Sequence, residues 1–536
     1  MKIRLNTIRL SSLYSFSGWI LPAFLTIIFF LLVRTKGQSQ FSVSGQLRTR
    51  TEIRDGYGNP VKQSSMTAAF TSQRTRMSFN YQVDPMLFKV SIQDIRVWGQ
   101  DASTISNADG SRLMLHEGWA EIRLSPQRDS LKKIATAVNA SLKIGRQELN
   151  YDDARLIGNL DWLQQGRHHD MALLRFRKSQ WQLEIGKAYN QNSDATGISG
   201  TSYLPGNLPV YIKNSVGVIV PNPAGMVPLT AMGNIYNNSA RTGSPAYSNS
   251  SGINSPSQDY KSFTHLYLVY KSSTSSYSFL FFNDRFGKYK LDSVPLDGGF
   301  VYGRRFVKST PAYPFDYSGL TNRFTYGMMA SRDLADINGI GKFNLQLAAY
   351  YQSGRDRDRL PLNAYHYSLM ASLQTKSFGY NLGYEVLSGN KTSTPPKQSH
   401  RFDPLYGTPH RHWGYLDYFY TGTGAPAGGL KDMYFKTRWV ARKKRLSSGL
   451  DVHAFYLQQE SQNTEGGAIK NYLGTELDWI NSYVLNKYTT LEVGLAALFN
   501  SASMRFVKNL DDESYKPTSK WAYVQINIKP DFILKN

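Results

Sequence analysis

Apolar and polar residues alternate with a period of two along residues 41–54 of the chain. One set of alternate positions is apolar or small and includes Phe41, Val43, Leu47 and Ile53. The intervening positions are polar and mostly charged, and they include Arg48, Arg50, Glu52 and Arg54. Because successive side chains of a β-strand point to opposite faces, this pattern predicts a strand with one apolar and one charged face. A half-buried strand of a soluble protein has the same pattern, so this run alone leaves its surroundings open.

Similar runs continue to the end of the chain. Residues 71–83 repeat the pattern, with Arg74 and Arg76 on the polar side, and Asp84-Pro85 predicts a short turn. The following run, 87–99, changes phase, which indicates a bulge near Gln93 and Asp94 that would place Asp94 and Arg96 on the polar face. Counting all such runs up to residues 521–528 predicts about 18 strands.

Short turns alternate with long polar segments, chiefly residues 190–258, 287–321 and 400–431. Outer-membrane barrels have this asymmetry, because their periplasmic turns are short and their external loops are long. We therefore predict an all-β fold, a transmembrane antiparallel β-barrel with long extracellular loops. The apolar part of 190–258 suggests a loop that folds inward as a plug or constriction. A β-sandwich, propeller or β-helix is the soluble alternative.

The N-terminus has the order of a secretory signal. Lys2, Arg4 and Arg9 precede an apolar stretch at 19–33, and Gly37 or Ser39 supplies a plausible cleavage site. A signal anchor is the alternative, but the apolar stretch is short for a spanning helix. We predict a signal peptide at residues 1–37, one barrel domain at residues 38–536, and a location in the outer membrane of a Gram-negative bacterium.

Composition narrows the function classes. The hydrophobic fraction of 41% and the mean hydropathy of −0.41 argue against a bundle of membrane helices. Aromatic residues reach 13%, including 35 Tyr, which suits the aromatic girdles of a barrel. The chain has no cysteine, so disulfide and thiolate chemistry are excluded.

The formal net charge of +23 predicts an anionic partner. Given the export signal, we expect anionic sugar polymers and lipopolysaccharide rather than nucleic acid. With lipid outside, the charged faces must point into the barrel. The predicted pore-lining, anion-binding residues are Arg48, Arg50, Arg74, Arg76, Arg96, Arg146, Arg155 and Arg167. Acids predicted to brace them are Glu52, Asp94, Glu117, Asp152 and Asp170. For each arginine, structural bracing and direct contact with a passing anion both remain open.

Several motifs together resemble the alginate export family of outer-membrane β-barrels. They are residues 145–149, residues 155–158 followed by Trp162, the Arg167/Asp170 pair, residues 350–354 and residues 406–419. The resemblance extends from about Phe41 to Pro530. It implies an 18-stranded monomeric barrel with a positively charged pore that passes an acidic polysaccharide.

Other candidate sites do not add up to a mechanism. His168-His169 and the His410/His412 pair lack a convincingly spaced third metal ligand, and residues 107–111 lack the full ligand spacing of a calcium loop. No residues stand out as a catalytic triad. We therefore predict no enzyme activity, no cofactor and no metal. The expected function is export or diffusion of uronate-type polysaccharide or oligosaccharide through an arginine-lined pore. A general or small-anion porin is the alternative, and a barrel enzyme acting on lipid or peptide is a less favoured one.

Overall fold

A computed structural model describes most of the chain between residues 40 and 532. The described ranges are 40–99, 113–125, 138–190, 211–214, 218–221, 223, 226–228, 260–286, 289–306, 320–334, 336, 339–356, 360–391, 398–420, 426–441, 445–462, 467–508 and 514–532. The predicted signal peptide, the segment 107–111 and most of the predicted plug at 190–258 lie outside these ranges.

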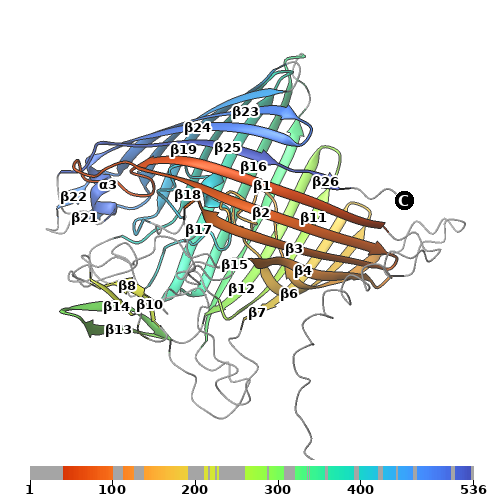
Figure 1. Cartoon of the computed structure of the whole chain (residues 1–536), viewed down its shortest axis with the longest axis horizontal. Coiled ribbons are helices and arrows are strands. Elements are labelled where there is room, and N and C mark those ends of the chain that lie inside the picture. Colours follow the sequence, from red (N-terminus) through yellow and green to blue (C-terminus); the bar gives the residue numbers. More distant parts are fainter. Residues whose placement is uncertain are drawn as a thin grey trace, which may run out of the picture.

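Antiparallel strands form a closed barrel (Figure 1). The sheet has 19 strands, of which β26 (Asp531–Phe532) is two residues long, and the other 18 are the barrel strands. The predicted strand number is therefore confirmed. Closure comes from β25, which pairs with β1 from Leu47↔Ile528 to Asp55↔Lys520. The barrel strands are β1 (Gln40–Asp55), β2 (Ala68–Val83), β3 (Met86–Val97), β4 (Met114–Arg123), β5 (Asn139–Gln147), β6 (His169–Lys178), β7 (Trp181–Tyr189), β11 (Ser262–Lys271), β12 (Ser275–Phe286), β15 (Thr321–Leu334), β16 (Lys342–Arg355), β17 (Pro361–Gln374), β18 (Phe378–Leu387), β19 (Leu430–Val440), β20 (Leu446–Leu457), β23 (Tyr472–Asn486), β24 (Thr489–Asn500) and β25 (Thr518–Ile528).

The two ends of the barrel differ. Most connections at one end are short turns, such as 179–180, 272–274 and 375–377, whereas most connections at the other end are longer segments. The longer segments carry the remaining elements, and those that Figure 1 labels lie at its left. They are β8 (Tyr211–Lys213), β9 (Ile219–Pro221), β10 (Met226–Pro228), β13 (Tyr289–Leu296), β14 (Gly299–Phe306), η3 (Pro409–Arg411), β21 (Ser461–Gln462), β22 (Ala468–Ile469) and α3 (Ala502–Val507). The long-loop end is the extracellular end of such a barrel.

No helix in the described part of the chain is long and apolar enough to cross a membrane.

The charged face of β1 points inward. Arg48 and Arg50 are 4% and 3% exposed, whereas Leu47 and Ile53, at the alternate positions of the strand, are 37% and 50% exposed. The alternation recurs in β17, where Ala364 is buried and Tyr365 is exposed. Apolar side chains on the outside and charged ones inside match a lipid-facing barrel, so the predicted orientation of the first strand is confirmed.

The predicted bulge in β3 is wrong. Strand β3 pairs with β2 without interruption, and Gln93 lies directly opposite Arg76 on the inner face. The shift occurs instead in β4, where His116 is the extra residue. Because β3 keeps its phase, Asp94 and Arg96 belong to the outer face and not the inner one. They form an ion pair of 2.7 Å with each other.

Two inward loops fill the long-loop half of the barrel. The β5–β6 loop comprises residues 148–168, and the second, residues 398–420, belongs to the connection between β18 and β19. Their backbones are joined by Tyr406 N–H to Leu156 O at 2.9 Å and Gly158 N–H to Tyr406 O at 3.0 Å. Both loops contribute to one buried core with the barrel wall. The core members from the loops include Leu149, Leu156, Ile157, Phe402, Leu405, Tyr406, Trp413, Leu416, Tyr418 and Phe419.

Candidate functional site

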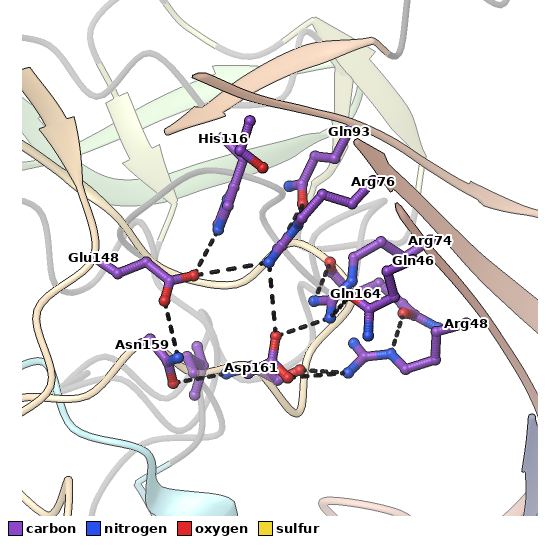
Figure 2. Close-up of polar contacts among 12 residues, drawn as sticks. Gln46, Arg48, Arg74, Arg76, Gln93, His116, Glu148, Asn159, Asp161 and Gln164 are labelled. Atoms are coloured by element: carbon purple, nitrogen blue, oxygen red, sulfur yellow. Dashed lines mark hydrogen bonds and ion pairs between the residues drawn. The ribbon is translucent and has the colours of Figure 1, made fainter. Parts of the chain in front are cut away.

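Arginines of β1 and β2 converge on the β5–β6 loop (Figure 2). Arg48 and Arg74 are direct cross-strand partners, and Arg76 lies two residues further along β2. Like charges directly opposite each other destabilise a sheet unless a counter-charge lies between them. Asp161 from the loop supplies that counter-charge, with its Oδ1 2.8 Å from Arg74 Nη2 and its Oδ2 3.5 Å from Arg48 Nη1. The loop and the arginine wall are therefore electrostatically complementary.

Arg48 and Arg50 hold the loop mainly through its backbone. Arg48 donates to Asp161 O at 2.7 Å, to Leu163 O at 3.0 Å and to Gln164 Oε1 at 3.0 Å. Arg50 donates to Trp162 O at 3.0 Å, and its guanidinium lies 4.1 Å from the centre of the Trp162 ring. Trp162 also stacks on His410 of the second loop at 4.1 Å. Bracing is thus the geometry observed for these two arginines.

Arg74 is fully buried, whereas the Asp161 side chain is 44% exposed. Arg74 also donates to Gln164 O at 3.2 Å and to Gln46 Oε1 at 2.7 Å. Burial would raise the pKa of Asp161, but the charges of Arg74, Arg48 and Arg76 outweigh it and lower that pKa below its usual value. Asp161 is therefore ionised, and its carboxylate is the exposed member of an otherwise buried group of arginines.

Arg76 links this cluster to a second group of acids. It donates to Gln93 Oε1 at 3.0 and 2.7 Å and lies 3.9 Å from Glu148. Glu148 in turn contacts His116 Nε2 at 2.7 Å and accepts from Asn159 Nδ2 at 3.0 Å.

His116, Glu117 and Glu148 offer ligand atoms within 4.8 Å of one another, a spacing that a metal ion could bridge. Glu117, however, already pairs with Lys89 and accepts from Trp119 Nε1 at 2.9 Å. Both glutamates therefore neutralise neighbouring cations, so the arrangement favours an ion-pair network over a cation site.

Arg155 and Arg167 lie within the inward loop and are both 5% exposed. Arg155 pairs with Glu385 of the barrel wall and with Asp153 at 3.1 Å. Arg167 donates to Gly407 O of the second loop at 2.6 Å. Both side chains fasten the loops to each other or to the barrel wall. They therefore lie in the barrel interior, as predicted, but they are buried and do not line an open surface.

Arg146 lies on the opposite face from the one predicted. It pairs across strands with Asp170 through two 2.8 Å contacts. This pair stands in register between two inward-facing pairs that include the buried Gln147 and Met171. Alternation therefore assigns Arg146 and Asp170 to the outer face, as it does Arg96 and Asp94.

The other predicted bracing acids lie inside. Glu52 is bonded by Arg50 at 3.0 Å and by Arg54 at 2.7 Å, and Asp152 accepts from Tyr267 Oη at 2.8 Å. Sequence reasoning missed Asp161 and Gln164, which complete the contact between the wall and the loop. The available signal was that they lie one and two residues from Trp162, which belongs to one of the motifs that resemble the alginate export family.

Comparisons with known proteins agree with this architecture. Residues 39–188 match the alginate export family, which confirms the resemblance over the first seven strands. No curated protein sequence matches the chain. Among solved structures, the chain is similar to OccAB4 of Acinetobacter baumannii, with 11% identity, a TM-score of 0.52 and coverage of 93% of this chain and 100% of that one.

Two Pseudomonas aeruginosa structures give similar values. OccK11 (OpdR) is 10% identical, with a TM-score of 0.51 and coverage of 92% and 96%. OpdO is 12% identical, with a TM-score of 0.50 and coverage of 92% and 98%. These similarities show the fold. Together with the apolar exterior and the family match, they indicate an outer-membrane β-barrel channel.

Proposed function

We propose that this channel passes uronate-type anionic polysaccharide or oligosaccharide by diffusion, without a cofactor or an energy source. The observation that carries the proposal is the charge of the β1–β2 wall. Five arginines there, Arg48, Arg50, Arg54, Arg74 and Arg76, meet the acids Glu52, Asp161 and Glu148. Cations are in excess, so the wall favours anions in the space beside it. In the same proposal, residues 1–37 are a removable export signal and 38–536 one domain.

The buried arginines contribute through their field and through the frame that they hold. Arg48, Arg50 and Arg74 are committed to the loop, so a passing anion would meet Arg76 and the Asp161 side of the cluster. Charges act over longer distances in a low-dielectric wall than in water, which lets buried guanidinium groups attract an anion that they do not touch. Weak attraction without tight chelation is what conduction requires.

A small-anion porin is the second candidate. The interlocked loops favour it, because they pack into one core with the barrel wall in the long-loop half of the barrel. A single small carboxylate needs less space than a polymer, whereas the charge of the wall attracts both.

Planar-bilayer recording separates the two. We expect anion preference in a KCl gradient and block of the current by hexagalacturonate, with no block by neutral maltohexaose. Arg76→Gln should lower the anion preference, and Arg332→Gln, at an exposed position of β15, is the matched control. Cation preference in the wild-type channel would refute the proposal. Anion preference without block by hexagalacturonate would select the small-anion porin.

A further inference from the structure

Exposed cations also face the lumen in the short-turn half of the barrel, away from the arginine cluster. Arg177 lies near the end of β6, Lys271 ends β11 and Lys342 begins β16. All three are exposed, whereas Arg48 and Arg74 are buried. Because both loops occupy the other half of the barrel, an anion that enters from the short-turn side meets these three groups first.

Strand alternation assigns all three to the inner face. Arg177 pairs with Gln182, which precedes the inward Glu184 by two residues. Lys271 follows the buried Tyr267 and Val269 at steps of two. Lys342 continues the even-numbered series of β16 that contains the buried Ala348 and Tyr350.

Among the described residues, the acids make at most a long-range electrostatic contact with these cations, that of Asp152 with Lys271. Arg177 donates to the neutral Gln182 Oε1 at 2.8 Å. Within the described residues, none of the three lies within ion-pair distance of a carboxylate. On the inner face of this arc, Asp333 accepts from Asn344 Nδ2 at 2.7 Å, and Glu184 accepts from Gln182 Nε2 at 2.8 Å. Arg177, Lys271 and Lys342 therefore keep their charges available to a ligand.

The three groups form an arc at one level of the barrel. Only β7 separates β6 from β11, and β12 and β15 separate β11 from β16. By cross-strand register, Lys271 lies two residues nearer the turns than the partner of Arg177, and Lys342 lies four residues nearer them than the partner of Lys271. With neighbouring strands about 4.8 Å apart and a rise of about 3.4 Å per residue, the separations are about 12 and 20 Å. Such an arc suits a chain of repeated negative charges better than one compact ion.

The whole short-turn end is basic. Further described cations in its turns are Lys376, Arg445, Lys487 and Lys529. The acids described at this end are Asp84, Asp333, Asp336 and Asp531, of which Asp84 pairs with Arg123. The excess of positive charge would raise the local concentration of a polyanion.

We infer that the short-turn mouth is a capture site for an acidic polysaccharide arriving from the periplasm, with Arg177, Lys271 and Lys342 as its first contacts. The inference rests on the proposed function and adds to it a loading side and therefore a direction, outward. Polymer captured at this mouth is presented to the loop-filled half as an extended anionic chain.

Side-specific block of single channels tests the inference. Because the chain has no cysteine, Ser273→Cys in the β11–β12 turn gives one thiol whose reaction with a membrane-impermeant reagent identifies the short-turn side. Hexagalacturonate is then added to one side at a time at low salt. Three unit charges about 10 Å from a carboxylate in water change its binding roughly tenfold. We expect the triple variant Arg177→Gln, Lys271→Gln and Lys342→Gln to weaken block from the short-turn side by that factor.

The matched control removes the same charge from the outer face through Lys178→Gln, Lys187→Gln and Lys520→Gln, which should leave the block unchanged. Equal block from both sides, or an unaltered triple variant in a channel that is otherwise anion-selective and blocked by hexagalacturonate, would overturn the capture site alone. A wild-type channel without anion preference would instead overturn the proposed function.

Discussion

Arg74→Met tests whether the arginine wall holds the β5–β6 loop in place. The substitution keeps most of the side-chain volume and removes three hydrogen bonds, to Asp161 Oδ1 at 2.8 Å, Gln164 O at 3.2 Å and Gln46 Oε1 at 2.7 Å. Two of these join the wall to the loop. Because Arg74 is fully buried, no water replaces it without further rearrangement.

The loss can be estimated from these contacts. A hydrogen bond involving a charged group contributes about 1.5–3 kcal/mol, so two of them give about 3–6 kcal/mol. The lower end applies, since Asp161 is 44% exposed and keeps Arg48 at 3.5 Å. About 3 kcal/mol corresponds to a roughly 150-fold rise in the undocked population of the loop.

Hydrogen exchange of the loop amides measures that population directly, and single-channel recording detects it as larger and noisier currents. Asp161→Asn alone and with Arg74→Met completes a double-mutant cycle, and we expect a coupling energy of about 1–2 kcal/mol between the two side chains. Unchanged exchange at residues 160–165 in Arg74→Met, with the barrel still folded, would refute the reasoning.

Three further predictions concern the same loops. Trp162→Leu removes the contacts with Arg50 and His410, each at 4.1 Å, and should reduce the free energy of loop docking by about 3 kcal/mol. The expected result is faster proteolysis within residues 148–168, and a protease-resistant variant would contradict it. Burial lowers the pKa of His168 to about 2 and that of His412 to about 3, below the unfolded value near 6.5. The undocked loops therefore bind more protons below pH 6.5, so docking is constant above about pH 7 and weakens as the pH falls, by about 1.4 kcal/mol per histidine and pH unit. Channel noise should rise at pH 5.5 and rise less in His168→Gln, and noise independent of pH would exclude this effect. Gly414→Ala places a Cβ 2.5 Å from a Glu476 oxygen at a φ of +82°, and it should lower the melting temperature more than Gly298→Ala, which has a φ of +74° and open space around it.

The barrel was predictable because period-two patterning is a local property. Arg48 and Leu47 lie on opposite faces whatever surrounds the strand, and lipid decides which face is outside. Sites that depend on register were not predictable in the same way. A change of phase in 87–99 suggested a bulge there, but β3 tolerates Ile95 on the inner face, and the extra residue is His116 of the next strand.

The candidate site was predictable only on the side of the wall. Arg48, Arg50, Arg74 and Arg76 follow from alternation, and they do face inward. Their partner Asp161 lies 87 residues from Arg74 along the chain, and no local pattern connects the two. The sequence therefore indicated where the positive charges gather. That these charges hold a loop in place is visible only in the folded structure.

The seam between β1 and β25 sets the order of assembly. The last long strand pairs with the first, joining Arg54 to Trp521, and Trp521 also donates its indole N–H to Glu52 at 3.0 Å. Pairing between residues so distant in sequence closes slowly, since the intervening chain must already be arranged. Until the C-terminal strands arrive, β1 has an unpaired edge, and a chain truncated before residue 518 would keep that edge permanently open to other chains.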